Sequence, residues 1–238
     1  MVCAGEGANS GSSFSRPRGA LIVVEGVDRS GKTTQCTRLA EALNQSGMKA
    51  EMWRFPDRST ALGKTINDYL ASKAELDDAV IHLLFAANRF EKRAAILSAL
   101  AAGTTLVIDR YSYSGIAYTS AKLVPHLDME WCRASESGLP APDLLIFMTL
   151  PPEVAATRGG YGEERYEKAA FQKQVALQFE AQRDDSWTVV DASPTPDELN
   201  KQMVALALPV VQRCSAGGAP LYMLWGKKTI SLGGECSG

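Results

Sequence analysis

The sequence predicts an α/β fold in three layers, in which helices cover both faces of a parallel sheet. Short apolar runs without polar alternation, such as residues 106–108 and 144–148, alternate along the chain with stretches of helical periodicity. This is the pattern of parallel strands buried on both faces. In addition, the apolar residues 20–24 lead into a glycine-rich loop and then a helix-like stretch, a strand–loop–helix unit typical of phosphate-binding folds.

Three predicted elements end at a glycine or a proline, residues that favour a boundary. The first helix stops at Gly47, the second strand is closed by Pro56, and the long helix that follows ends at Gly103. Ligands of such sheets bind beyond the carboxyl ends of the strands, so we expect the site there. We expect about five strands, at residues 20–24, 49–55, 104–109, 143–150 and 187–191, and helices at 33–46, 59–71, 79–102, 112–120, 127–136, 164–183 and 196–208.

The composition excludes several classes of function. A hydrophobic share of 45% and a charged share of 22% fit a globular chain with a buried core. The net charge of −2 predicts neither a nucleic-acid nor a membrane partner. The five cysteines are scattered and form no C-x-x-C pair, so we expect a reducing compartment, with no disulfide framework and no zinc site. The predicted location is cytoplasmic, with a nuclear or organellar pool as alternatives.

The two ends of the chain differ in composition from its centre. Residues 1–18 are rich in glycine and serine, and we expect them to form a disordered leader. Residues 19–215 are predicted to form one domain, and residues 216–238 a C-terminal extension. Within that extension residues 221–225 are apolar enough to dock on the body, whereas 226–238 are expected to form a loose tail.

Residues 26–33, GVDRSGKT, form a complete G-x-x-x-x-G-K-T phosphate-binding loop. The glycines let successive backbone N–H groups turn toward one anion, and the helix that follows adds the positive end of its dipole. Lys32 would reach the β- and γ-phosphates of a nucleotide, and the Thr33 hydroxyl would bind Mg²⁺. An ordinary glycine-rich turn that caps a helix is the alternative, but the apolar strand before the loop favours nucleotide binding.

An acidic residue ends the third predicted strand. Asp109 follows the apolar residues 106–108, and an acid at the end of an apolar strand holds Mg²⁺ in nucleotide-binding proteins with this loop. Taken alone, such an acid is usually structural; the phosphate-binding loop favours the metal role. Arg110 comes next, where a cation could meet a transferring phosphate. The alternative is an Asp–Arg pair on the surface.

Several segments together resemble the thymidylate kinase family. They occur in the family's order, and the resemblance spans about residues 19–208. It implies a P-loop kinase fold with a five-stranded parallel sheet and a short lid, and Mg²⁺-dependent transfer of the ATP γ-phosphate to dTMP, giving dTDP and ADP. The segments are GVDRSGKT at 26–33, RFPDR at 54–58, LLFAANR at 83–89, DRYSYSG at 109–115, GLPAPD at 138–143 and RYE at 165–167.

The resemblance implies roles in binding the substrates. Asp28 would accept a hydrogen bond from the sugar 3′-hydroxyl of dTMP, and Arg29 would reach over the transferring phosphate, so that the catalytic charge lies in the loop rather than in the lid. Arg58 and Arg110 would hold the acceptor phosphate. Arginine suits these tasks because its planar fork can hold two phosphate oxygens at once.

The same resemblance implies a base pocket and a lid. Phe85 would stack on thymine and Arg89, one helical turn onward, would bond the base; the four-residue spacing puts both on one helix face. Core packing is the alternative for Phe85. Tyr118 would crowd the ribose 2′ position and so favour deoxyribose. Glycines within residues 158–165 would let that stretch close as a lid.

The full set of implied site residues is larger. The catalytic residues are Arg29, Lys32, Asp109 and Arg110, and Thr33 and Asp109 would hold the metal. The ATP site comprises Gly26, Asp28, Arg29, Ser30, Gly31, Lys32, Thr33, Thr34 and Arg158. The dTMP site comprises Asp28, Phe55, Arg58, Phe85, Arg89, Arg110, Ser114, Gly115, Tyr118, Tyr166 and Glu167. The resemblance also implies a homodimer, in which helices such as residues 79–102 pack across a two-fold axis.

Two other functions stay open at this point. A deoxynucleoside kinase would need a carboxylate base near a 5′-hydroxyl, for which Asp57 is the candidate. The arginines at 58 and 110 argue instead for an acceptor that already carries phosphate. A nucleotide-operated switch would need a guanine-reading N-K-x-D segment late in the chain, and residues 200–203, NKQM, lack the aspartate.

Overall fold

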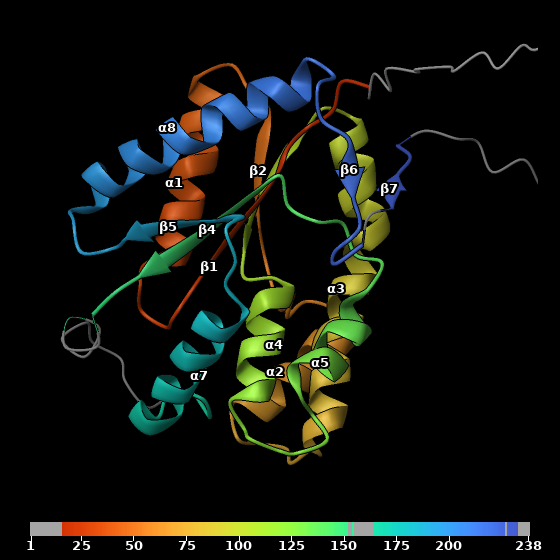
Figure 1. The fold of residues 1–238 in the computed structure, drawn as a ribbon, viewed down its shortest axis with the longest axis vertical. Coiled ribbons are helices and arrows are strands. Elements are labelled where there is room, and N and C mark those ends of the chain that lie inside the picture. The colour runs from red at the N-terminus through yellow and green to blue at the C-terminus, as the bar shows by residue number, and fades with distance from the viewer. Residues whose placement is uncertain (1–15, 152–153, 155–163, 227, 233–238) are drawn as a thin grey trace, which may run out of the picture.

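A computed structural model describes residues 16–151, 154, 164–226 and 228–232 of the chain. In these residues five parallel strands form one sheet in the order β2-β3-β1-β4-β5 (Figure 1), as the sequence predicts. The strands are β1 (Leu21–Gly26), β2 (Ala50–Arg54), β3 (Thr105–Asp109), β4 (Leu144–Thr149) and β5 (Trp187–Asp191). The helices are α1 (Lys32–Gln45), α2 (Ala61–Leu70), α3 (Asp78–Ala101), α4 (Ser112–Ser120), α5 (Met129–Glu136), α7 (Ala169–Gln182) and α8 (Pro196–Ser215).

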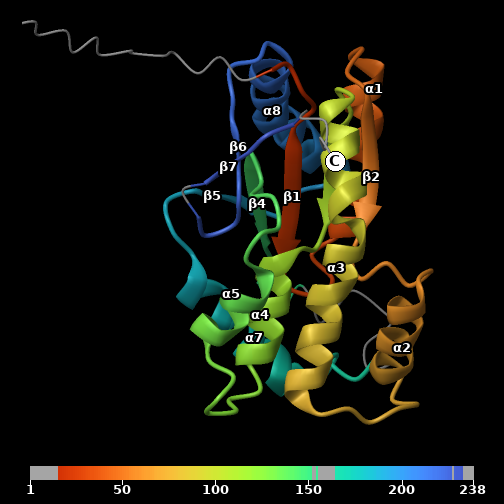
Figure 2. The ribbon, with the colours of Figure 1, turned by 90° about the vertical axis from the view of Figure 1, so that its right-hand side faces the viewer.

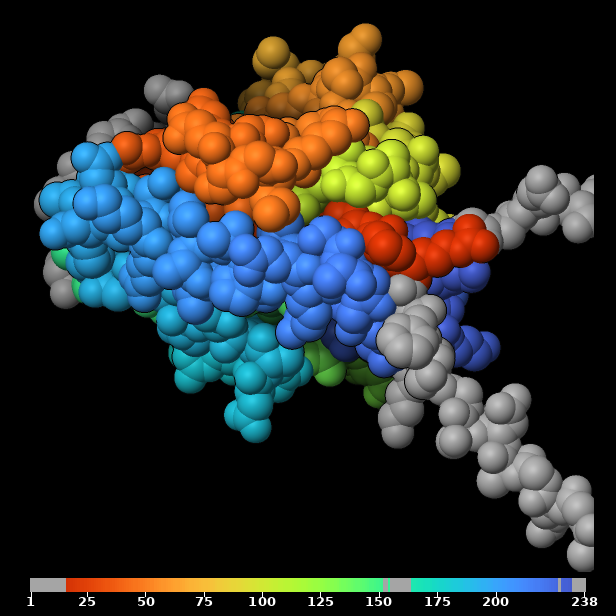
Figure 3. All heavy atoms as spheres, turned by 90° about the horizontal axis from the view of Figure 1, so that it is seen from above, coloured from red at the N-terminus to blue at the C-terminus, as the bar shows by residue number. Residues whose placement is uncertain are grey.

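The central strand β1 is buried on both faces, and its residues alternate between two cores. Ile22 and Val24 pack with α1 and α8, which lie side by side over one face of the sheet (Figure 3). Leu21 and Val23 pack on the other face, against residues of α3, α4 and α7. All four side chains are fully buried. The continuous apolar run predicted this two-sided burial.

The order of the strands places the site. β1 lies between β3 and β4. The chain that leaves β1 enters α1 on one face of the sheet, whereas the chains that leave β3 and β4 lead to α4 and α7 on the other face. A crevice at the carboxyl ends of the strands is expected at such a point. The end of β1 and the segment after β3 meet there, since the Arg110 amide donates to the Val24 carbonyl at 3.1 Å.

Helix α7 begins at Ala169, five residues later than Glu164, the start that the sequence predicts. Residues 164–168 are held instead by the end of α2. The Arg165 amide donates to Leu70 O at 2.9 Å, and its guanidinium donates to Tyr69 O at 2.9 Å. These tertiary bonds override the helical propensity of the charged run.

Helix α8 continues past Leu208, where the prediction ended it, and runs through Pro209 to Ser215. A proline inside a helix removes one backbone hydrogen bond and costs roughly 3 kcal/mol. Val211 and Cys214, two and five residues after Pro209, are buried in the core. Burial of this face offsets the cost of the proline.

Both ends of the described chain are tied to the body. Arg18, the last residue of the predicted leader, is buried and pairs with Asp143 at 2.6 Å. Residues 1–15 lie outside the described residues, so the disordered leader stays a prediction. Residues 221–225 dock on the body as expected, but Thr229–Ile230 (β7) pairs in antiparallel fashion with Leu221–Tyr222 (β6). At least this part of the predicted loose tail is therefore ordered.

In the described part of the chain, every helix is too short or too polar to cross a membrane. The described cysteines, Cys36, Cys132 and Cys214, are buried free thiols.

Candidate active site

The loop between β1 and α1 has the backbone of a phosphate cradle. Gly31 caps α1 in the left-handed region with φ 88°, and Arg29 is also left-handed at φ 70°. At Gly26 a Cβ would lie 2.4 Å from Met148 O, so the chain can pass β4 only with glycine at that position. Thr33 and Thr34 are exposed in the first turn of α1, where backbone N–H groups attract an anion.

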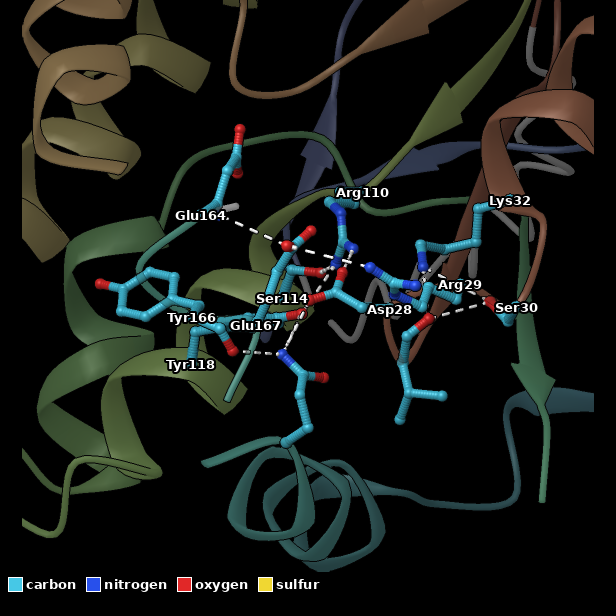
Figure 4. Close-up of polar contacts among 12 residues, drawn as sticks. Asp28, Arg29, Ser30, Lys32, Arg110, Ser114, Tyr118, Glu164, Tyr166 and Glu167 are labelled. Carbon is cyan, nitrogen blue, oxygen red and sulfur yellow. Dashed lines mark hydrogen bonds and ion pairs between the residues drawn. The ribbon is translucent and has the colours of Figure 1, made fainter. Parts of the chain in front are cut away.

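Lys32 folds back into this loop. Its Nζ donates to Val27 O at 2.6 Å and lies 3.4 Å from Ser30 Oγ, which itself donates to Val27 O at 3.0 Å (Figure 4). Burial, reinforced by the nearby Arg110, lowers the pKa of Lys32 from 10.5 to about 8. An anion in the cradle would favour the charged amine.

Asp109, at the end of β3, lies beside the loop. Thr33 Oγ1 donates to Asp109 Oδ2 at 2.5 Å, and Arg54 Nε lies 3.6 Å from the same oxygen. Asp109 is almost fully buried, and its Oδ1 has no hydrogen-bond partner in the described residues. A hydroxyl and a carboxylate with an unused oxygen are the ligand types that Mg²⁺ prefers, so these residues fit the metal.

A cavity of about 220 Å³ opens next to the loop. Every residue that the sequence assigns to dTMP lines it, although these residues come from the phosphate loop, from the segments after β2 and β3, from α3 and α4, and from residues 166–167. Their convergence from distant parts of the chain makes this cavity the candidate acceptor site. The residues are Asp28, Phe55, Arg58, Phe85, Arg89, Arg110, Ser114, Gly115, Tyr118, Tyr166 and Glu167.

Asp28 and Arg110 form the floor of the cavity. They make a close ion pair, and Asp28 also accepts from Gln172 Nε2 at 2.7 Å (Figure 4). Burial opposes the charge of Asp28, but Arg110 and Lys32 outweigh it and lower the pKa of this carboxyl. Arg110 Nη1 lies 3.3 Å from Ser114 Oγ and 3.4 Å from the Tyr118 hydroxyl. The surface alternative for Arg110 is wrong, because its partner is Asp28 rather than an exposed acid.

Arg89 of α3 lines the cavity. A buried ion pair with Glu136 of α5 holds its guanidinium in place. Arg89 Nε donates to Glu136 Oε2 at 2.8 Å, and Nη2 donates to Oε1. Ser112 Oγ donates to the same carboxylate at 2.9 Å. At Gly115 a Cβ would lie 2.6 Å from Arg89 Nη2, so a larger residue there would have to displace the guanidinium from this pair.

Glu25, within β1, holds the first turn of α4. Its carboxylate accepts from the amides of Tyr111 at 2.8 Å and Ser114 at 3.0 Å, and from Ser114 Oγ at 2.5 Å. Complete burial raises the pKa of Glu25, against the hydrogen bond from Ser114. These bonds fix the segment that carries Arg110 and Tyr118.

Glu164, Tyr166 and Glu167 line another side of the cavity. Glu164 pairs with Arg58 at 2.8 Å, and Glu167 lies 3.9 Å from Arg29 Nη2. Tyr166 stacks on Phe171, with ring centroids 5.1 Å apart. Arg158, predicted to contact ATP, lies outside the described residues.

Asp57, the candidate base of a deoxynucleoside kinase, does not line this cavity. It pairs with Lys92 at 2.6 Å, and hydrogen bonds from Lys92 and Ser59 lower its pKa to about 2. Such a carboxylate is a poor base near neutral pH. Residues 200–203 lie within α8 with Met203 buried in the core, which argues against a guanine-reading loop there.

Three polar residues that support the site were not predicted from the sequence: Glu25, Glu136 and Gln172. The sequence does contain a signal for a functional role of Glu25, since it is an acid at the end of a strand that is otherwise apolar. Glu136 and Gln172 lie on helices of mixed polarity, and only the tertiary structure brings them to Arg89 and Asp28.

These elements define a P-loop kinase in which a nucleotide loop and an acceptor cavity share one edge of a parallel sheet. A family model described as thymidylate kinase matches residues 24–203. The chain belongs to the thymidylate kinase family, nucleoside monophosphate kinases that carry out ATP-dependent phosphotransfer.

Individual relatives agree with this membership. The thymidylate kinase of Arabidopsis thaliana is 52% identical over 210 residues, 88% of this chain and 78% of the relative. That of Homo sapiens is 44% identical over 211 residues, 87% of this chain and 98% of the relative. A solved structure of thymidylate kinase from Candida albicans matches with a TM-score of 0.76 at 35% identity, over 91% of this chain and 99% of that one.

Proposed function

We propose that the chain transfers the γ-phosphate of ATP to dTMP, with the acceptor bound in the 220 Å³ cavity. One observation supports this most strongly: Arg58 and Arg110 line a cavity that opens beside the phosphate-binding loop. Two guanidinium groups at that position suit an acceptor that already carries a phosphate. In the acceptor complex the phosphate would replace Glu164 and Asp28 as the partner of these two arginines.

Other residues of the cavity would bind the sugar and the base of dTMP. Asp28 would accept a hydrogen bond from the 3′-hydroxyl, and Tyr118, in contact with Arg110, would exclude a 2′-hydroxyl. Phe85 would stack on the thymine ring while Arg89, oriented by Glu136, bonds its edge. A site that pairs its own polar groups with those of the substrate rejects analogues that lack them.

Transfer itself needs charge stabilisation more than covalent help. Lys32 and Arg29 would neutralise the charge of the transferring group, while Arg58 and Arg110 align the acceptor. The dTMP phosphate is already an anionic nucleophile, so no base is required. Closure of the lid onto Arg29 through Glu167 would exclude water.

We also propose that Mg²⁺ binds with ATP at Thr33 and Asp109. The support is the donor set described above, including the buried Asp109 Oδ1 without a partner in the described residues. The bound metal would neutralise part of the phosphate charge.

The exposed side of α3 supports a homodimer. Val80, Leu83 and Phe90 are 45%, 48% and 37% exposed, and their spacing of three and seven residues puts them on one face of the helix. Figure 2 shows α3 running along the outer surface of the molecule. The buried free thiols support a reducing compartment, for which the cytoplasm is our proposal.

The test is ADP formation by the purified protein with ATP, Mg²⁺ and a panel of acceptors: dTMP, UMP, AMP and thymidine. We expect turnover chiefly with dTMP. Preference for thymidine would favour the deoxynucleoside kinase, and ATP binding without acceptor-dependent turnover would favour a switch.

A further inference from the structure

A second cavity, of about 320 Å³, lies between the C-terminal segment and the body, and shares no lining residue with the acceptor cavity. Its walls come from the first turn of α4, from α5, from the junction of α7 and β5, and from residues 222–226. Its volume is at the lower end of the range for small-molecule sites, which begins at roughly 300 Å³.

Aromatic rings form one side of this cavity. Tyr113 makes edge-to-face contacts with Trp187, with centroids 5.2 Å apart, and with Trp225, at 5.9 Å. Trp225 and Tyr222 are 41% and 46% exposed. The segment that carries them is fixed, because the Leu224 amide donates to Leu139 O at 2.8 Å. These rings offer a flat ligand an aromatic surface without further rearrangement.

Two polar groups of the same cavity have unused hydrogen-bonding atoms. Gln182 is 5% exposed; its Nε2 donates to Tyr113 O at 3.1 Å, whereas its Oε1 has no partner in the part of the chain that the structure describes. Arg133 Nε is buried and likewise lacks a partner there. One acceptor and one charged donor of lining residues are therefore covered and without partners, and a ligand would satisfy both when the two side chains turn toward it.

The charges of the cavity restrict the ligand further. Arg133 is the one cation among the lining residues, and Asp184 is an anion in the same wall. A phosphate would need more positive charge than this pair offers. The balance of charges therefore favours a neutral ligand.

We propose that this cavity binds an uncharged nucleobase or nucleoside. The ring would lie against Trp225 and Tyr113, a ring carbonyl would accept from Arg133, and a ring N–H would donate to Gln182 Oε1. The donor and acceptor of a base edge match these two groups, and neither ATP nor dTMP is expected to enter because of their phosphates.

The experiment uses the full-length protein saturated with ADP and dTMP, so that the sites for ATP and dTMP are filled. Uracil, hypoxanthine, uridine, inosine and UMP are titrated in turn, and the indole N–H resonances are followed by NMR. We expect saturable shifts of Trp187 and Trp225 and none of Trp53, which lies elsewhere, on β2.

Two variants make the test specific. Arg133→Met should weaken binding by about tenfold or more, because it removes a charged hydrogen bond. Arg183→Met is the matched control, since this exposed arginine pairs with Glu180 outside the cavity, and it should bind as the wild type does. Normal ADP formation from dTMP by both variants shows that they are folded.

Three results would overturn the proposal: no saturable shift with any compound, wild-type affinity in Arg133→Met, or tighter binding of UMP than of uridine. Equal affinity for uracil and uridine would support recognition of the base alone, and tighter binding of uridine would support a nucleoside site.

Discussion

Arg89 enters the acceptor cavity from α3 with two of its nitrogens held by Glu136 of α5. The two side chains are 3% and 0% exposed, and a buried pair of this kind has two consequences. It orients the guanidinium with little loss of conformational freedom on binding. It also leaves an uncompensated charge if one partner is removed.

Glu136→Gln should therefore raise the KM for dTMP by about tenfold, because Arg89 loses its charged partner and its orientation. The KM for ATP and kcat should change by less than about twofold, since Glu136 does not touch the phosphate loop. Steady-state kinetics with each substrate varied in turn would measure this. Glu136→Asp, which keeps the charge, should recover part of the affinity; an unchanged KM in folded Glu136→Gln would refute this role.

The pKa of Lys32, about 8 in the nucleotide-free protein, gives a second prediction. A depressed lysine pKa means that burial of the charged amine costs stability at neutral pH. This cost is relieved as the pH rises from about 8 toward 10.5. ATP requires the charged form, so its affinity should instead fall by up to about tenfold between pH 7 and pH 9.

Calorimetric titration of ATP at fixed Mg²⁺ over this pH range would measure the effect. Lys32→Arg is the control, because arginine keeps its charge throughout and should give a flat profile. A flat profile in the wild type would show that Lys32 does not titrate in this range.

Among the elements, the C-terminal segment adds more to the fold than its composition indicates. Leu221 and Leu224 are each 3% exposed and pack in the core on the α3 side of the sheet. Leu224→Ala should lower the free energy of unfolding by about 2–5 kcal/mol, the usual cost of a large-to-small change in a core. Leu123→Ala, at a side chain that is 65% exposed, should change it by less than about 0.5 kcal/mol.

Denaturant unfolding of both variants would measure these differences. A Leu224→Ala variant as stable as the wild type would contradict the docking of this segment.

The element order was predictable because buried parallel strands leave a continuous apolar signal, and glycine and proline mark the boundaries. The errors have tertiary causes. Residues 164–168 have helical propensity but bond to the end of α2 through Arg165. Pro209 predicts a helix end, yet Val211 and Cys214 keep α8 in the core. Neither contact can be predicted from the residues next to it in the sequence.

For the molecule as a whole, the exposed apolar face of α3 predicts the state of association. Leu83→Glu should convert a dimer into a monomer, because a carboxylate buried in an apolar interface has no partner to compensate its charge. Leu177→Glu, on the exposed side of α7 at 59% exposure, is the matched control and should stay dimeric. Analytical ultracentrifugation would measure both, and a dimeric Leu83→Glu would place the interface elsewhere.

The site was predictable to the extent that chemistry follows from short motifs. The loop at 26–33, Asp109 and the arginines at 58 and 110 stand in recognisable segments, and the fold brings them to one edge of the sheet. Glu136 and Gln172 were not predictable, because their roles depend on which helix faces which. Asp57 was misleading for the same reason: it lies in a cavity-lining segment but pairs with Lys92.

The turnover of Arg29→Ala with saturating ATP and dTMP is the first measurement to make, because we propose that the catalytic charge lies in the phosphate loop. We predict that kcat falls by about 10³, as for other arginines that stabilise a transferring phosphate, with Arg38→Ala, an α1 arginine paired with Asp197, as the unaffected control. Wild-type kcat in Arg29→Ala would show that Arg29 does not stabilise the transferring phosphate.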